Sequence, residues 1–238
     1  MTIRPIITAA VGALMLLCLC CHGTRSQSIR EWEGRQWQRL KTNDRQAALG
    51  YEAYYRSVPG TKVREYRITG ELAINPQEAV HALREKSERA DRYLDAKTGF
   101  VEVLESTPTE LLTYSVYRLP WPFRDRSMRE RFHLHHDAGT GERRIEWTSE
   151  WAGAQPEPPG VVRMPDVHGS WVFKPRDGGG CQATYTVYAD PGGRFPVSLF
   201  NATVLKGLGA ELTGLESLVK SLRRSAGDEL LSKTEDVP

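Results

Sequence analysis

The fold is decided near the C-terminal end, by residues 196–224, PVSLFNATVLKGLGAELTGLESLVKSLRR. Apolar side chains recur in this stretch three or four residues apart, which is the spacing of one helix face. The members of this stripe are Phe200, Val204, Leu208, Leu212, Leu215, Val219 and Leu222. The pattern predicts one long amphipathic helix, and its stripe needs a broad apolar surface to cover it.

The segments before this helix supply such a surface. Strand-like alternation marks residues 98–106, 111–119, 126–137, 143–151, 169–174 and 182–189. Upstream, we expect a short amphipathic helix over 32–41, strands over 51–56, 63–70 and 72–75, and a helix over 76–88. Asn75 is the expected N-cap of that last helix, with Pro76 as its first residue. The order predicts an α+β fold in which a curved antiparallel β-sheet wraps around the long C-terminal helix.

The N-terminus differs from the rest of the chain. An almost wholly apolar run extends from Ile6 to Cys21 behind a short positively charged start. The run is too short for a comfortable membrane span, and it predicts a signal peptide or lipoprotein leader over residues 1–23. Lipidation would use Cys20 or Cys21, and an uncleaved anchor is the third option. We therefore expect an exported, periplasmic protein.

Composition and charge narrow the class of protein. The 238 residues are 39% hydrophobic and 26% charged, which is ordinary for a globular protein. A net charge of +2 without a basic run does not suggest a nucleic-acid partner. Once the leader is removed only Cys181 is certain to remain, so the fold depends on its core rather than on disulfides. We expect one domain over residues 30–224 and a flexible C-terminal tail over 225–238.

Four short segments resemble, in chain order, elements of the START (StAR-related lipid-transfer) domains of the helix-grip superfamily. Residues 54–61, YYRSVPGT, resemble the first hairpin, and residues 120–125, PWPFRD, the element between two central strands. Val162-Arg163 and Gly169–Trp171 resemble the strand before the last hairpin. Residues 190–196, DPGGRFP, resemble the junction between the last strand and the lid helix. Together the segments span about residues 32–224.

The resemblance implies a helix-grip fold with an internal cavity under the C-terminal helix, and a neighbouring loop that opens with this helix to admit a ligand. The expected gate is Pro120, Trp121, Pro122, Phe123, Arg124, Asp125, Gly192 and Gly193. The two prolines stiffen the loop, and an Arg124–Asp125 ion pair is expected to pin it.

Strand alternation selects the residues that we expect to line the cavity. In residues 126–137 one face carries Met128, Glu130 and Phe132, and the other carries Arg129 and Arg131. The predicted lipid-binding set is Tyr114, Val116, Met128, Glu130, Phe132, Trp147, Trp151, Arg163, Tyr185, Val197, Phe200, Asn201, Val204 and Leu208. The same residues could instead fill an ordinary core.

Glu130 is the unusual member of this set, because a carboxylate on an apolar face is costly unless it is paired. Some sterol-binding relatives have an arginine at the matching place, so the resemblance carries no ligand over to this chain. We interpret Glu130 as a polar anchor for a ligand head group, opposite Arg118 or Arg163. The alternative is a glutamate at the sheet edge that a neighbour satisfies.

The resemblance implies non-catalytic binding or transfer of a lipid or other hydrophobic small molecule, with transient membrane contact and no cofactor. One alternative is a helix-grip enzyme of the cyclase or hydrolase type, in which Glu130 acts with Tyr114 or Tyr185 in proton transfer. Another is a scaffold for a protein partner, with a filled interior. His133 and His135 share a strand face without a third ligand nearby in the sequence, so no metal site is predicted.

Overall fold

The computed structural model describes residues 36–40, 50–89 and 98–235 of the chain. Its strands are β1 (Gln38–Arg39), β2 (Tyr51–Ser57), β3 (Arg64–Leu72), β4 (Thr98–Ser106), β5 (Glu110–Tyr117), β6 (Asp125–His136), β7 (Arg143–Ser149), β8 (Val161–Arg163), β9 (Val167–Pro175) and β10 (Cys181–Ala189). Its helices are α3 (Pro76–Glu88) and α5 (Val197–Glu235). The predicted leader, residues 1–23, lies outside the described residues.

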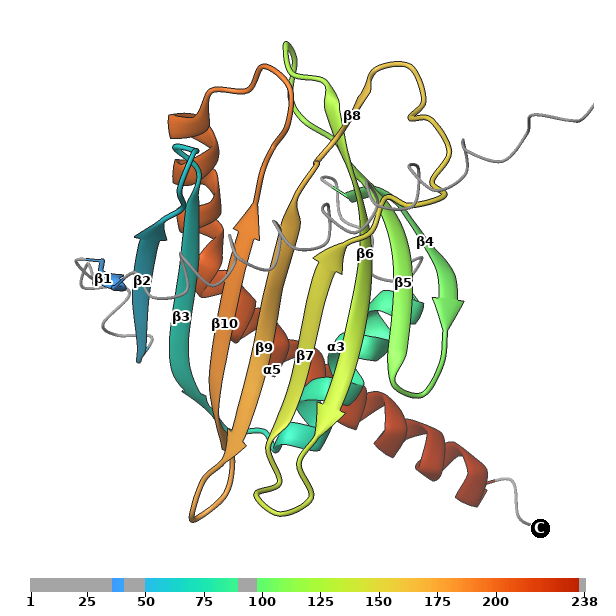
Figure 1. The fold of residues 1–238 in the computed structure, drawn as a ribbon. Helices are drawn as coiled ribbons and strands as arrows, with labels where there is room; N and C mark the ends of the chain where they lie inside the picture. The colour runs from blue at the N-terminus through green and yellow to red at the C-terminus, as the bar shows by residue number, and fades with distance from the viewer. Residues whose placement is uncertain (1–35, 41–49, 90–97, 236–238) are drawn as a thin grey trace, which may run out of the picture.

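The strands form one sheet in the order β1-β2-β3-β10-β9-β7-β6-β5-β4. Neighbours along this path are antiparallel, and β8 pairs in parallel with the start of β6. Figure 1 shows α5 running diagonally across one face of this sheet, with α3 on the same side. The predicted α+β architecture, a large antiparallel sheet with one long C-terminal helix, is therefore confirmed.

Three details differ from the prediction. Gln38 and Arg39, which we expected within a helix over 32–41, form β1 instead, because they pair with Tyr55 and Tyr54 of β2. The expected strand over 72–75 is the end of β3 followed by a bend into α3. The long helix does not end at Arg224 but continues to Glu235, so most of the expected tail over 225–238 is helical.

The cap of α3 agrees with the prediction. The Asn75 side chain accepts a hydrogen bond from the Glu78 backbone N–H at 2.9 Å, and the Glu78 carboxylate accepts one from the Asn75 N–H at 3.1 Å. This reciprocal capping box fixes where the helix begins. Ala79 and Ala82 are fully buried and press α3 onto the core.

Two glycines allow α5 to approach the β2–β3 side of the sheet closely. A Cβ at Gly70 would lie 2.9 Å from Leu212, and a Cβ at Gly209 would lie 2.2 Å from the Tyr51 hydroxyl. Both contacts show that the helix packs against the sheet face that carries Tyr51 and Gly70, which we call the inner face. Side chains directly opposite on neighbouring strands share a face, so the strand register assigns the other residues to the inner or the outer face.

Within the described residues, no helix is long and apolar enough to cross a membrane.

Candidate functional site

A row of aromatic side chains crosses the inner face from β6 to β10. Phe132 lies 5.9 Å from Trp147 between ring centroids, and Trp147 stacks 5.8 Å from Tyr185. Trp171 continues the row, 4.6 Å from Tyr185. Gly169 makes the row possible, because a Cβ there would lie only 2.3 Å from the Trp147 ring.

The apolar residues of the inner face are of two kinds. Some form the buried core, as Ile68 on β3, Phe173 on β9 and Leu212 on α5 illustrate. Others pack against that core but keep some accessible surface, and one group of them lies on β6, β10 and the first part of α5: Met128, Phe132, Leu134, Tyr185, Val187, Phe200, Val204 and Leu205. The predicted residues Met128, Phe132, Tyr185, Phe200 and Val204 thus share one half-buried apolar region. Of the remaining predictions on this face, Trp147 and Leu208 are buried in the core beside it.

Glu130 lies on the inner face among these residues, as predicted. Its cross-strand neighbours are Thr113 on β5 and Ser149 on β7, and only 8% of its surface is exposed. None of the described residues makes a hydrogen bond or ion pair with its carboxyl group. Burial alone raises the pKa of Glu130 to about 7. Neither predicted partner, Arg118 or Arg163, faces it.

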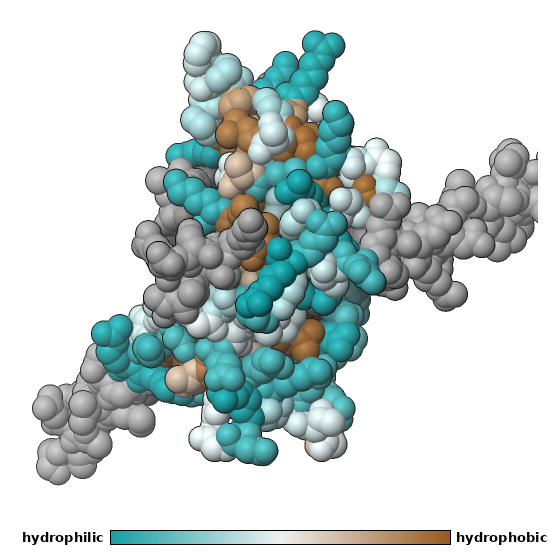
Figure 2. Space-filling model, turned by 90° about the vertical axis from the view of Figure 1, so that its left-hand side faces the viewer, coloured by the Kyte–Doolittle hydropathy of each residue, from teal (hydrophilic) through white to brown (hydrophobic). Residues whose placement is uncertain are grey.

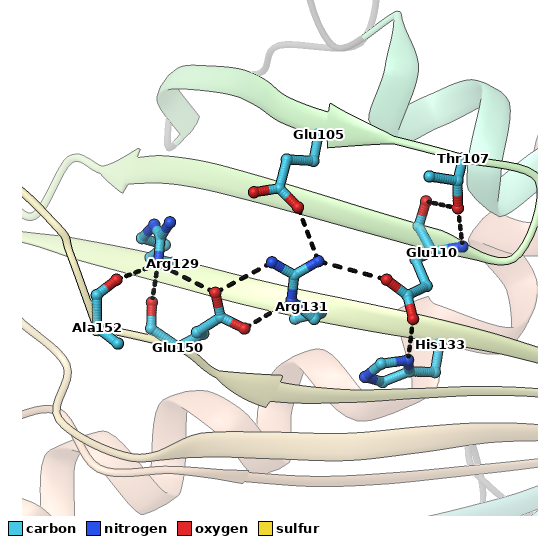
Figure 3. Close-up of polar contacts among 8 residues, drawn as sticks. All are labelled: Glu105, Thr107, Glu110, Arg129, Arg131, His133, Glu150 and Ala152. Atoms are coloured by element: carbon cyan, nitrogen blue, oxygen red, sulfur yellow. Dashed lines mark hydrogen bonds and ion pairs between the residues drawn. The ribbon is translucent and has the colours of Figure 1, made fainter.

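The outer face of the same strand is the opposite case. Arg131 lies between three carboxylates, with nitrogen–oxygen distances of 2.6 Å to Glu150, 2.9 Å to Glu105 and 3.5 Å to Glu110. Figure 3 shows this network, which Arg129 extends to Glu150. Each outer-face carboxylate around Arg129 and Arg131 therefore forms an ion pair with an arginine. Glu130 lies between these two arginines in the sequence but on the opposite face, and no described arginine pairs with it.

Tyr114, Val116 and Arg163 were predicted to line the cavity, and the structure shows that this is wrong. Tyr114 is opposite Arg129, and Val116 is opposite Ser127, so both lie on the outer face. The Tyr114 hydroxyl donates a hydrogen bond of 2.7 Å to Glu157, which also pairs with Arg163 at 3.1 Å. Burial, followed by this hydrogen bond, raises the pKa of Tyr114 to about 12. The strand pattern of β5 misled us because both of its faces carry apolar residues.

These side chains border a separate feature of the outer face. Tyr114, Val116 and Arg118 line an open recess of about 360 Å³ together with Phe100 and Val161. Trp151 belongs to the same side, because the Arg163 guanidinium lies 4.3 Å from its ring centroid. Its indole N–H donates to the Met164 carbonyl at 3.1 Å.

Asn201 and Val197 lie at the start of α5. The Asn201 amide accepts a hydrogen bond from the Arg64 N–H at 3.2 Å and donates one to the Lys62 carbonyl at 3.0 Å. It therefore fastens α5 to the β2–β3 hairpin and is not available to a ligand, contrary to our prediction. Val197 is half-buried at the first turn of the helix.

The predicted gate consists of two segments that the structure brings into contact. We call residues 120–125 the gate loop and residues 190–196 the gate junction. Phe123 of the loop packs on Phe195 of the junction, 4.6 Å between ring centroids. Gly192 has a φ of 62° and approaches the Arg163 carbonyl so closely that a Cβ would lie 2.5 Å from that oxygen.

The gate loop is pinned differently from our expectation. The Asp125 carboxylate accepts a hydrogen bond of 3.0 Å from the Leu119 N–H instead of pairing with Arg124. The main link is Arg126, which the sequence did not single out. Its buried guanidinium donates to the carbonyls of Arg124 in the loop and of Pro191 and Gly192 in the junction. Arg126 thus joins both halves of the gate.

Glu211 on α5 is the second residue that our sequence analysis missed. It comes three residues after Leu208 and four before Leu215, so it occupies the apolar stripe of the helix. The residue is exposed, and partial desolvation of its carboxyl group raises the pKa of that group. The spacing alone could have revealed it, as an acid within an otherwise apolar stripe.

Comparisons with known proteins agree with this geometry. No family model matches the chain. A protein of Pseudomonas aeruginosa described as uncharacterized, PA1579, is 28% identical over 205 residues, which cover 86% of this chain and 95% of that protein. A solved STAR-related lipid transfer protein from Xanthomonas axonopodis is 29% identical with a TM-score of 0.65, and the match covers 78% of this chain and 99% of that one.

More distant structures share the fold. Human STARD10 has a TM-score of 0.67 at 14% identity, over 91% of this chain and 87% of that one. The Zhui aromatase/cyclase of Streptomyces sp. R1128 has a TM-score of 0.50 at 15% identity, over 69% of this chain and 98% of that one. The sequence motifs, the sheet order, the long C-terminal helix and these likenesses agree: the chain has the helix-grip fold of START domains.

Proposed function

We propose that the chain binds one lipid or other hydrophobic small molecule between the inner face of the sheet and α5, and that it carries this molecule without converting it. The observation that carries the proposal is the half-buried apolar region on β6, β10 and α5. Apolar side chains that face a covering helix yet keep accessible surface are suited to contact a guest molecule. The START-type fold, and the lipid transfer named for the Xanthomonas protein, support it.

Native mass spectrometry of the purified protein, followed by extraction of bound lipids, tests this proposal. We expect a co-purifying hydrophobic molecule that Val187→Trp reduces, because Val187 is half-buried on the inner face. The matched control is Val172→Trp, since Val172 is opposite Thr184 and Arg144 on the outer face. A delipidated protein that takes up no hydrophobic molecule would contradict the proposal, as would equal occupancy in both variants.

Entry and release require a gate, and we propose that the gate loop and the gate junction separate to open it. Opening would break the Arg126 hydrogen bonds to Pro191 and Gly192 and part Phe123 from Phe195. These contacts lie at one place in the fold, so breaking them would open the gate without unfolding the domain.

The same end of the molecule is suited to transient membrane contact, which we propose as part of ligand exchange. Trp121 in the gate loop is 91% exposed, and Leu199 in the first turn of α5 is 46% exposed. Figure 2 shows apolar surface gathered at this end, where α5 begins. Exposed Arg124 and Arg194 flank it and favour anionic lipid. Trp121→Ser should weaken sedimentation with anionic vesicles, and unchanged sedimentation would argue against this contact.

A second candidate function is acid–base catalysis, and the raised pKa of Glu130 is the specific observation that favours it. Of its two predicted tyrosine partners, Tyr185 remains, because Tyr114 lies on the other face of the sheet. Chemical conversion of a bound ligand by wild-type protein but not by Glu130→Gln would establish catalysis. Recovery of the ligand unchanged would support carriage.

We further propose that residues 1–23 direct export. Lipidation at Cys20 or Cys21 is one form of processing to be tested. The mass of the mature N-terminal peptide decides between cleavage, a lipidated cysteine and an uncleaved leader. Recovery of the protein in the cytoplasmic fraction with all residues present would refute export.

A further inference from the structure

One cluster of buried polar side chains interrupts the apolar inner face of the sheet. It consists of Thr113 and Ser115 on β5, Glu130 on β6 and Ser149 on β7, and each of them is less than one tenth exposed. Thr113 and Ser149 lie directly opposite Glu130 on either side of it, and Ser115 lies opposite Met128, the next inward-facing residue of β6. Side chains directly opposite on neighbouring strands have Cβ atoms about 5 Å apart, and diagonal neighbours lie about 7–8 Å apart. The strand register therefore brings these side chains together, and we call the cluster the polar patch.

The polar patch lies inside the domain, beyond the gate. Arg126 and Glu130 belong to the same face of β6 and are four residues apart in the strand. At about 3.3 Å per residue, Glu130 is about 13 Å along the strand from the residue that joins the gate loop to the gate junction. Phe132 follows on the same face and begins the aromatic row. Along β6, the polar patch thus lies between the gate and the aromatic row.

The members of the polar patch differ in whether their hydrogen bonds are already made. The Ser149 hydroxyl accepts a hydrogen bond from the Val167 N–H at 3.2 Å, which ties it to the sheet. Among the described residues, none makes a hydrogen bond with the Thr113 or Ser115 hydroxyl or with the Glu130 carboxyl group, and no cation pairs with Glu130. Buried polar groups without partners are costly, so these three side chains favour a bound group that completes their hydrogen bonds.

The chemistry of these three side chains selects the polar end of a guest molecule. The Thr113 and Ser115 hydroxyls can each donate and accept, and the Glu130 carboxylate accepts. A hydroxyl group likewise donates and accepts, and it brings no charge into the interior. A carboxylate or phosphate can only accept, and it would meet Glu130 with no described cation beside it. An ammonium group can only donate, and its burial carries the desolvation cost of an ion pair in the interior.

We infer that the polar patch is the head-group subsite of the proposed cavity, and that it selects hydrophobic molecules that end in a neutral hydroxyl group. This hydroxyl donates to Glu130 and accepts from Thr113 or Ser115, while the apolar body of the molecule lies along the aromatic row. The polar end is therefore held inside the domain and not at the gate. The inference rests on the proposed function, because it requires that a hydrophobic molecule enters this interior.

Calorimetric titration of the full-length protein with four probes of one chain length tests the inference: 1-decanol, its methyl ether, decylamine and decanoate. The ether accepts a hydrogen bond but cannot donate one, so its comparison with the alcohol separates hydrogen bonding from hydrophobic burial. At about pH 7 the alcohol should bind about tenfold more tightly than the ether, and more tightly than either charged probe. This comparison uses the wild-type protein and decides the question even if a variant fails to fold.

Substitutions in the polar patch assign the preference to its residues. Glu130→Leu removes the acceptor and should bring the affinities for the alcohol and the ether close together, whereas Glu130→Gln keeps an accepting oxygen and should retain most of the difference. Thr113→Val keeps the shape and removes a hydroxyl, so it should lower the affinity for the alcohol several-fold. Glu102→Leu and Thr148→Val are the matched controls, because both residues are exposed on the outer face. The controls should bind all four probes as the wild type does.

The outcomes separate this inference from the proposed function. If the alcohol and the ether bind the wild type equally, the subsite is refuted and hydrophobic binding stands. The same holds if their difference survives unchanged in both Glu130→Leu and Thr113→Val. If decylamine or decanoate binds most tightly, the interior prefers a charged end and the inference is overturned. If no probe binds, the proposed function and the subsite fall together.

Discussion

Glu130→Gln should change the stability of the fold in a pH-dependent way. Burial raises the pKa of Glu130 from its ordinary value of 4.5 to about 7 in the folded protein. In the unfolded chain the carboxyl group is hydrated and releases its proton near its ordinary pKa. Between these two values the folded state therefore holds a proton that the unfolded state has lost.

The sign and the size of the stability change follow from this difference in pKa. When folding raises the pKa of a carboxyl group, the fold keeps its full stability below the unfolded-state pKa of that group. It loses stability as the pH rises from the unfolded-state pKa to the folded-state pKa, because the ionised group is buried without a partner. A shift from 4.5 to about 7 corresponds to a loss of about 3 kcal/mol, complete above about pH 7. Glutamine has nearly the same shape and no charge, so the variant escapes this loss.

Denaturant unfolding of the ligand-free wild type, of Glu130→Gln and of Glu102→Gln at several pH values between about 4.5 and 8.5 measures the effect. We expect the first two proteins to be similar at the acidic end and Glu130→Gln to be more stable by about 3 kcal/mol at the alkaline end. Glu102 is exposed on the outer face opposite Tyr114, so Glu102→Gln should follow the wild type throughout. A constant difference between Glu130→Gln and wild type over the whole range would refute the reasoning, since it would show that Glu130 does not titrate in this window.

Three further variants test other parts of the structure. Gly169→Ala places a Cβ 2.3 Å from the Trp147 ring and 2.4 Å from the Thr186 carbonyl, so it should cost about 3 kcal/mol in urea unfolding, and an unchanged midpoint would contradict the close packing. Arg126→Met removes the hydrogen bonds that join the two halves of the gate, so stopped-flow exchange of a fluorescent lipid should become several-fold faster, and an unaltered rate would remove Arg126 from the gate. Asn75→Ala breaks the capping box of α3 and should lower stability by about 1 kcal/mol, whereas a neutral effect would mean that the cap is dispensable.

Much of the fold could be predicted because its signals are local. The stripe from Phe200 to Leu222 predicts α5, and the alternation between Met128 and Phe132 assigns the faces of β6 correctly. The N-cap at Asn75 and its neighbouring proline place the start of α3 at the correct residue. Each of these features depends on neighbours within a few residues in the chain.

The errors arise where the deciding contact is distant in sequence. Tyr114 looks like a cavity residue by alternation, yet its face is set by pairing with Arg129, and its hydroxyl is held by Glu157. The strand β1 exists only because β2 pairs with it. Arg126 gains its role from carbonyl groups of Pro191 and Gly192, which lie more than sixty positions away and show no sequence signal of their own.

The charges of the interior also bear on the choice between carriage and catalysis. Proton abstraction next to a carbonyl group, or cyclisation through an enolate, builds negative charge on oxygen and needs cations or hydrogen-bond donors aimed at it. Here Glu130 is buried, and no cation among the described residues acts on it. Tyr185 stays protonated because its pKa is raised so strongly, so it cannot serve as a base near neutral pH. An ionised carboxyl group in the interior, with no cation beside it, opposes a developing oxyanion. The same burial that makes Glu130 a candidate general base therefore weighs against oxyanion chemistry and supports carriage of an unchanged ligand.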